Sequence, residues 1–583
     1  MSPSLRLPAR AAVLAHSLPE LGIPGGPPIP PAASPPARTP HLARGPPEPS
    51  RLRGLAEMPG PSSTAFIFEL LCRGGVRRLH EMQVHGRSRF GPLWKARFGP
   101  VLTVHVADPA LVAQVLRQEG PEPSRALSCP WKEHRSLRGV SGGLLTLARG
   151  VRGGAGGDSG VIQFPPPPPA PPTPPRRMEG EAWRGPRRVL AQGLLRPGAA
   201  EAFAGPVATV VAELVARLQR LRRQHPRGIV PDIGTEFNRF GLEAISWVLF
   251  SSRLGCLGDT GEATVGTEGV IRSVGAVLAL TLVTMALPRP LLRLFPAPWD
   301  AFCHAWDQLF AFAKGHVDRR VAEVAARGPL AEGDTCVTDL LAREHIPVSS
   351  IYGNVTELLL AGVDTVASTL AWSLYELAQN PGTQAALHRE LVAATATSGI
   401  TSGDSATTDS AAAAATATAL GRLPLLRAVV KETLRLYPVI PANARVVSNS
   451  DIRVGDYLVP RQTLITLCHY ATSRDSRFFP APNAFHPERW LRHRDIGDSP
   501  GDTPGDTPGH SPGPKHPFAS LPFGLGPRSC VGRRLAELQL HMALAQILLH
   551  FEVCPEPGGG RVRPMTRTLL APGAPISLRF LER

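Results

Sequence analysis

The sequence of 583 residues contains no apolar run as long as the roughly 20 residues that a membrane-spanning helix requires. The longest candidate, residues 274–287, is shorter and predicts a buried helix or one that dips into a membrane surface. No Cys-x-x-Cys pair occurs among the eight scattered cysteines, which argues against a disulfide framework or a zinc site and favours a reducing compartment. A strand followed by Gly-x-Gly-x-x-Gly and a helix is also missing, so the chain is not expected to bind NADPH or flavin itself.

Acidic residues are fewer than basic ones, 47 against 63, and the net charge is +16. A charge of this size favours an anionic partner or surface. Because no nucleic-acid motif and no basic stripe interleaved with aromatic residues accompanies it, we expect an acidic protein partner and no nucleic acid.

The N-terminal region, residues 1–57, is basic and rich in proline. Its first 19 residues include arginines but no acid, which is typical of a mitochondrial transit peptide. The prolines argue against a continuous amphipathic helix, so a disordered basic tail is the alternative. We therefore expect the folded domain to span residues 58–583.

Three internal segments have compositions that do not favour a packed core. Residues 147–178 contain runs of proline and glycine, residues 396–418 are rich in alanine, threonine and serine, and residues 494–515 repeat Gly-Asp-Thr-Pro. We predict that all three are disordered insertions into a single domain.

The periodicity of the remaining chain predicts a mainly α-helical fold with a small sheet near the N-terminus, at residues 90–106. The longest periodic segment, residues 350–379, has Ser349 as its expected N-cap. The other expected elements are helices at 109–118, 236–250, 270–316, 423–437 and 533–551, and short strands at 440–445 and 451–473.

One thiol lies in a glycine-rich loop directly before a predicted helix. Cys530 follows Gly524 and Gly526 and precedes the helix at residues 533–551. Glycines allow positive φ and a close approach to a flat ligand, and a helix N-terminus favours a thiolate, which a metal ion would stabilise further. A lone cysteine is more often an inert buried thiol, so the residue alone leaves both interpretations open.

The whole pattern Phe-x-x-Gly-x-Arg-x-Cys-x-Gly at residues 523–532 resembles the haem-binding loop of the cytochrome P-450 monooxygenases. The resemblance covers roughly residues 58–583 outside the three insertions. It implies a cytochrome P-450 fold, with a large helical domain and a small β-rich region, and haem b (iron protoporphyrin IX) between the long central helix and this loop. By this resemblance Cys530 is the axial thiolate ligand of the haem iron.

Further haem contacts follow from the same resemblance. Phe523 and Gly524 belong to the haem-binding loop, and Arg528 and Arg445 are expected to reach haem propionates. The pair Trp183 and Arg187 matches the family's Trp-x-x-x-Arg, which also reaches propionates; ordinary surface packing of the two side chains is the alternative. Pro186 departs from the family pattern and is tolerated only if it lies in the first helical turn.

Two further motifs gain roles from the resemblance. In residues 361–365 of the long helix, Gly362 leaves room for dioxygen, and Asp364 and Thr365 relay protons; a buried capping pair is the structural alternative. Residues Glu432, Arg435 and Arg489 form a network that braces the Cys loop and has no catalytic role.

Within the family the chain is most similar to the mitochondrial class, in its branch of vitamin D hydroxylases, with the sterol 27-hydroxylases as the alternative. This implies a secosteroid substrate, O2, and electrons from a [2Fe-2S] ferredoxin with its NADPH-dependent reductase. It also implies peripheral contact with the matrix side of the inner mitochondrial membrane. The expected ferredoxin-docking residues are Arg427, Lys431 and Arg534, and the candidate substrate contacts are Asn443, Thr466 and Trp131.

Two interpretations from other classes compete with this one. A haem protein that binds sterol without turnover would not need the Asp364 and Thr365 pair for proton delivery. A proline-rich scaffold protein would account for the insertions but not for the motifs. The position at which the substrate is oxidised does not follow from these patterns, because it depends on how a few apolar side chains tilt the substrate.

Overall fold

The computed structural model describes residues 52–98, 101–120, 123, 129–146, 177–258, 261–287, 289–327, 336–398, 410–447, 450–491 and 516–583. The predicted insertion at 494–515 lies outside the described residues, and so does that at 147–178 apart from its last two positions, which begin a helix. Residues 1–51 also lie outside them.

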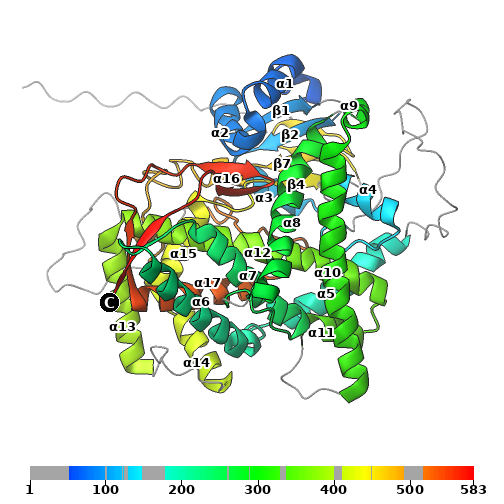
Figure 1. The fold of residues 1–583 in the computed structure, drawn as a ribbon. Coiled ribbons are helices and arrows are strands. Elements are labelled where there is room, and N and C mark those ends of the chain that lie inside the picture. The colour runs from blue at the N-terminus through cyan, green and yellow to red at the C-terminus, as the bar shows by residue number, and fades with distance from the viewer. Residues whose placement is uncertain are drawn as a thin grey trace, which may run out of the picture. The chain divides into compact units, whose positions relative to one another are not determined.

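Helices dominate the described chain, as predicted (Figure 1). The α-helices are α1 (Ser63–Leu71), α2 (Leu79–Phe90), α3 (Pro109–Arg117), α4 (Cys129–Arg138), α5 (Arg177–Leu195), α6 (Ala204–Gln224), α7 (Ile233–Phe250), α8 (Gly261–Ala286), α9 (Arg289–Leu294), α10 (Ala297–Arg327), α11 (Val337–Arg343), α12 (Val348–Gln379), α13 (Pro381–Ser398), α14 (Ser410–Leu420), α15 (Pro424–Leu436), α16 (His469–Thr472) and α17 (Arg533–His550). Short 3-10 helices are η1 (Leu55–Glu57), η2 (Gly75–Arg78), η3 (Glu201–Phe203) and η4 (Pro487–Trp490).

The largest sheet of the described chain has the strand order β1-β2-β7-β4 and confirms the predicted N-terminal sheet. Strand β7 runs parallel to β2, and the other two contacts are antiparallel, so the sheet joins the N-terminal region to the chain after α15. The strands are β1 (Leu93–Phe98), β2 (Val101–Val106), β3 (Ile229–Val230), β4 (Asn443–Val446), β5 (Ile452–Val454), β6 (Tyr457–Val459), β7 (Leu464–Leu467), β8 (Phe551–Pro555), β9 (Pro564–Arg567), β10 (Leu569–Pro572) and β11 (Leu578–Glu582).

The central helix α12 is buried on nearly all sides, because its sequence is apolar around its whole circumference. It packs against α7, α10, α15 and α17. The helix begins at Val348, two residues before the predicted start, and its N-cap is Pro347 rather than Ser349. Helix α17, which follows the Cys loop, packs on α12 and so fixes the loop relative to the central helix.

The prediction of a disordered insertion at residues 396–418 is wrong at both ends. Helix α13 continues to Ser398, and α14 begins at Ser410. Alanine has the highest helix propensity, so an alanine-rich run forms a helix once one face is buried. The side chains of Ala413, Ala417 and Leu420 lie on that face, and α14 packs on α6 and α17.

The folded unit also starts earlier than residue 58. The backbone of Arg53 forms a parallel bridge with Tyr457, with its N–H donating to the carbonyl of Asp456 at 2.9 Å. The Lys95 ammonium donates to the carbonyls of Leu55 and Ala56 at 2.7 and 2.8 Å. Residues 53–57 are thus held by β1 and β6 and do not belong to a separate leader.

Two described helices are long and apolar enough to cross a membrane, judged by length and composition alone, whereas the sequence analysis predicted none. The described residues contain a third candidate span only if the bent helix pair α14 and α15 is counted as one helix. The stretch Val348–Gln379 is 78% buried inside the protein, and Gly266–Met285 is 39% buried. The sequence count missed them because single polar residues interrupt their apolar runs. Their burial shows that both contribute to the protein core, α12 far more than α8.

Candidate haem site

The loop at residues 523–532 turns tightly and presents the Cys530 thiol. Gly524 and Gly526 have φ of +66° and +79°, which side chains with a Cβ adopt only with strain. The Cys530 N–H donates to the carbonyl of Phe523 at 2.9 Å and closes the turn. Cys530 itself is exposed, and α17 starts three residues later, so the thiol lies where the sequence placed it, just before a helix N-terminus.

Arg187 lies beside this thiol. Its Nη2 donates to the carbonyl of Ser529 at 2.9 Å, and its charge interacts with Cys530. Burial lowers the pKa of Arg187, and the sulfur opposes that shift. Pro186 lies inside α5 rather than in its first turn. The expectation that a proline is tolerated here only in the first helical turn is therefore wrong, and Arg187 still reaches the loop.

Arg528 is buried and connects three separate segments. Its Nε donates to the carbonyl of Pro123 and its Nη1 to the carbonyl of Leu144, both at 3.0 Å. Its guanidinium also stacks over the ring of Trp183, which is 5% exposed. The predicted pair Trp183 and Arg187 therefore meets the Cys loop through two different contacts and is not surface packing.

Arg445, the third predicted haem contact, is paired with a residue that the sequence analysis missed. Its Nε donates to Glu119, which follows α3, and both side chains are buried. Asn443 lies two positions before Arg445 on β4, and its amide makes a 2.8 Å hydrogen bond with His469. Asn443 also lies against the Cys loop, with its Nδ2 3.6 Å from the position that a Cβ atom would take at Gly524.

Helix α12 is fastened to the same site by Glu357. This buried carboxylate accepts from the N–H groups of Gly143, Leu145 and Thr146 and from the Thr146 hydroxyl. Since the Leu144 carbonyl accepts from Arg528, Glu357 links the central helix to the Cys loop through residues 143–146. The sequence feature that could have indicated this role is a charged residue within an apolar helix, because a buried carboxylate requires hydrogen-bond partners.

The predicted relay residues lie two turns further along α12. Asp364 is buried, which raises the pKa of its carboxyl, and the charge of Arg567 opposes the shift. The Thr365 hydroxyl donates to the carbonyl of Ala361 at 2.7 Å. In the part of the chain that the structure describes, no hydrogen bond joins Asp364 to Thr365.

The structure gives a reason in helix packing for the glycine at position 362 of α12. A Cβ atom at this position would lie 2.6 Å from Cγ1 of Ile245 on α7, and one at Gly241 would lie 2.8 Å from the carbonyl oxygen of Val363. The two glycines allow α7 and α12 to pack closely together. Gly362 therefore has a role in helix packing, and the expectation that it leaves room for dioxygen stays a prediction.

The predicted Glu432, Arg435 and Arg489 network forms. Arg435 donates to Glu432 at 2.8 and 2.9 Å, and Arg489 donates to the same carboxylate at 3.1 Å. The further bonds of Arg435 reach the carbonyls of Ser473, Pro482 and Ala484. Within the described residues these bonds brace the chain at 473–490, and none of them reaches the Cys loop, which the network was predicted to brace.

The remaining predicted residues differ in exposure. Arg427 and Lys431 lie exposed on one face of α15, and Lys431 lies 5.7 Å from the centre of the Trp490 ring. Arg534 is also exposed and donates to the carbonyl of Leu195 at 2.7 Å. The Trp131 N–H donates to Thr281 at 2.9 Å within the core, so it is occupied; Thr466 is half-buried on β7.

The sequence profile named Cytochrome P450 matches residues 176–580. The chain belongs to the cytochrome P450 family. It is 51% identical to the mitochondrial 25-hydroxyvitamin D-1 alpha hydroxylase of Homo sapiens over 92% of this chain and 94% of the human protein. The mouse protein of the same name is 48% identical over the same shares, and the mitochondrial sterol 26-hydroxylase of Rattus norvegicus is 34% identical over 91% and 90%.

Family membership confirms the predicted P450 fold and makes the chain a haem-dependent monooxygenase. The residues at the site fit the group. Cys530 is the exposed thiol of a tight loop, and Arg528 within this loop, with Arg187 and Arg445 outside it, supplies the positive charge that haem propionates require. All three relatives are named mitochondrial, which supports the location predicted from the basic leader.

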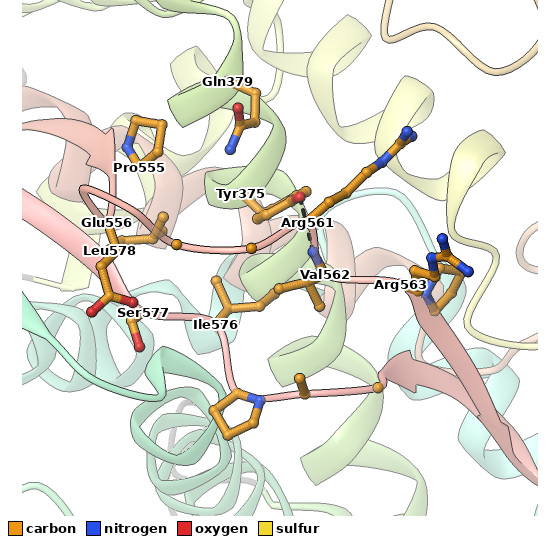
Figure 2. A pocket seen from close by; sticks show the side chains of 16 residues that line it. Tyr375, Gln379, Pro555, Glu556, Arg561, Val562, Arg563, Ile576, Ser577 and Leu578 are labelled. Atoms are coloured by element: carbon orange, nitrogen blue, oxygen red, sulfur yellow. Dashed lines mark hydrogen bonds between the residues drawn. The ribbon is translucent and has the colours of Figure 1, made fainter.

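A separate pocket lies away from these P450 residues (Figure 2). It has a volume of about 450 Å³ and lies between the C-terminal end of α12 and residues 555–578. The Tyr375 hydroxyl at its wall accepts from the N–H of Val562 at 3.2 Å, the dashed line in the figure. None of the predicted haem or substrate residues lines this pocket.

Proposed function

We propose that this cytochrome P450 hydroxylates 25-hydroxyvitamin D3 at C1α. The observation that carries the proposal is the 51% identity with a 25-hydroxyvitamin D-1 alpha hydroxylase over 92% of the chain. The sterol 26-hydroxylases, at 34% identity, are the second candidate, because they cover nearly the same length.

Haem bound through Cys530 would supply the redox chemistry, in which one atom of O2 enters a C–H bond and the other leaves as water with two electrons and two protons. Cys530 holds the group from the loop before α17. Arg187, Arg445 and Arg528 orient it through its propionates, and Trp183 fixes the position of Arg528.

Asp364 and Thr365 deliver the protons. Burial raises the pKa of Asp364, so its carboxyl exchanges protons nearer to neutral pH than an exposed aspartate does. The bond from Thr365 to Ala361 holds the hydroxyl oxygen on the helix surface, where it accepts a proton from one side and passes one to the other.

Electrons come from an acidic mitochondrial [2Fe-2S] ferredoxin with its NADPH-dependent reductase. Arg427, Lys431 and Arg534 form the docking surface, and their exposure supports this role. Opposite charges steer such encounters and raise association rates.

The protein lies on the matrix side of the inner membrane through an apolar surface around α9. Leu294 and Phe295 are 71% and 67% exposed, and Leu291 and Met285 nearby are also exposed. Arg293 is exposed in the same helix and suits anionic lipid headgroups. Phe68 and Leu71 of α1 add a second exposed apolar site.

The secosteroid lies in apolar surroundings on the α12 side of the site. Thr466 is the candidate partner of a substrate hydroxyl. Since the Asn443 amide already binds His469 and the Trp131 N–H binds Thr281, these two side chains contribute shape and leave hydroxyl recognition to other groups.

Product analysis tests the proposal. Purified protein is incubated with ferredoxin, its reductase, NADPH and either 25-hydroxyvitamin D3 or vitamin D3. We expect the 1α,25-dihydroxy product from the first substrate. Side-chain hydroxylation of vitamin D3 with little A-ring product from 25-hydroxyvitamin D3 would favour the sterol hydroxylase activity. Haem and sterol binding without any product would favour a non-catalytic binding protein.

A further inference from the structure

Glu119 and Arg445 form a buried ion pair that joins two distant parts of the chain. Arg445 lies on β4, and Glu119 lies just after α3; their side chains are 5% and 7% exposed. The Arg445 Nε donates to Glu119, and its Nη1 donates to the carbonyl of Ala444 at 3.0 Å. Two of the three guanidinium nitrogens are thereby fixed, and Nη2 has no hydrogen-bond partner among the described residues.

Glu119 borders the Cys loop, and Arg445 lies on the strand that reaches the loop through Asn443. Glu119 Oε2 lies 3.3 Å from the position that a Cβ atom would take at Gly526. Arg445 is two residues from Asn443, whose amide lies against Gly524. Any side chain at Gly526 would therefore meet Glu119, besides the strain of its positive φ.

The pairing restricts Arg445 in two ways. A free arginine side chain has many rotamers, and a bond at Nε selects one of them before a ligand arrives. A buried cation is also costly without a counter-charge, which Glu119 supplies. The arginine is thus held with one amino group left for a further acceptor.

We propose that Glu119 is a positioning residue of the haem site and acts through Arg445. This rests on the proposed function, because it requires Cys530 to hold haem and Arg445 to meet a propionate. Glu119 then orients the arginine, seats the Gly526 turn and places a fixed negative charge beside the haem.

The charges of the pair have opposite effects on reduction. Reduction adds one electron to the site, so a nearby carboxylate disfavours it and a nearby guanidinium favours it. Replacing Glu119 by glutamine removes the negative charge and keeps the shape. Replacing Arg445 by glutamine removes the positive charge.

The test measures the equilibrium between the ferric protein and a redox dye of known potential for wild type, E119Q, E119D, R445Q and E119Q/R445Q. We expect E119Q to shift this equilibrium toward reduced protein by about tenfold, a size that one charge on the order of 10 Å away produces at an effective dielectric constant of about 20. R445Q should shift it the opposite way. E119D keeps the charge and should stay near wild type. Glu537→Gln changes a half-buried glutamate that is paired with Arg533 on α17; it is the matched control and should have little effect.

Unchanged equilibria in both E119Q and R445Q would overturn the proposal, as would equal shifts in E119D and E119Q. If E119Q fails to retain haem while E119D retains it, the positioning role is supported. The carbon monoxide spectrum of each variant separates this question from the proposed function: the thiolate-type band persists in all of them if Cys530 is the ligand, whatever Glu119 does.

Discussion

The guanidinium carbon of Arg528 lies 3.9 Å from the centre of the Trp183 ring. The contact joins the Cys loop to α5, although the two residues are far apart in the chain. Arg528 also donates to the carbonyls of Pro123 and Leu144, so its side chain is held from three directions. The geometry of the haem site therefore depends on the packing of a tryptophan that carries no charge.

Replacing Trp183 by alanine should destabilise the haem-bound protein. The loss of a desolvated cation–π contact amounts to about 2 kcal/mol, and truncation of the buried ring adds to it. Trp183→Phe keeps an aromatic face and should lose much less. Denaturant unfolding monitored by the haem absorbance measures both. Equal losses for alanine and phenylalanine would contradict a stabilising role for an aromatic face under Arg528.

Cys530→Ser should abolish the red-shifted Soret band of the reduced carbon monoxide complex, because thiolate donation to iron produces this band. Cys554→Ser, on β8, is the control and should retain it. Spectra of the two purified variants give the answer, and a thiolate-type band in Cys530→Ser would refute the ligand assignment.

Thr365→Ala should bind haem and substrate but lose coupling, since proton delivery slows while reduction continues. Product formed per NADPH consumed should fall roughly tenfold, with peroxide in its place. Thr369→Ala is a matched control, because Thr369 bonds back to the carbonyl of Thr365 at 2.8 Å in the same helix. A relay at Thr365 is excluded if both variants uncouple to the same extent.

Gly362→Ala should destabilise the fold by about 1–3 kcal/mol, because the new methyl group overlaps Ile245. In a protein that already carries Ile245→Ala, the Gly362→Ala substitution should lower the free energy of unfolding by less than it does in the wild type. Gly315→Ala on α10 has no atom within 4 Å of its new methyl and should be neutral or stabilising. Thermal unfolding of these variants decides between packing and ligand space: if Gly362→Ala folds normally and only oxygen binding suffers, the packing role is wrong.

Lys431→Glu should slow the first electron transfer from ferredoxin roughly tenfold at low ionic strength and flatten its salt dependence. Lys314→Glu reverses an exposed lysine on α10 and should leave the rate unchanged. Stopped-flow reduction at two salt concentrations measures the effect. A docking role for α15 would be untenable if the two reversals had equal consequences.

Elements with a strong apolar periodicity could be predicted from the sequence, and local motifs placed Cys530, Glu432 and Arg435 correctly in their elements. The helix over Ala413 and Ala417 could not, because its composition resembles low-complexity sequence and only tertiary burial of one face reveals its role. The strand bridge at Arg53 depends on Tyr457, which is remote in the chain.

Partners of buried charges were the least predictable part of the site. Glu119 and Arg445 are separated by 326 positions, and no local pattern connects them. Gly362 was assigned to the ligand because its own helix gives no sign of Ile245 on α7. In both cases the missing information was which elements cross, which a single sequence does not contain.

The hydrogen bonds that hold residues 143–146 on Glu357 affect which changes in chain length the site tolerates. Thr146 is fixed to α12, and Trp183 on the next described helix, α5, is fixed to Arg528. The two ends of the connection are thus secured by different partners, and neither anchor depends on the number of residues between them. Insertions and deletions at this one place can accumulate over generations without disturbing the site, so the length of the connection is a poor guide to whether a relative retains the activity.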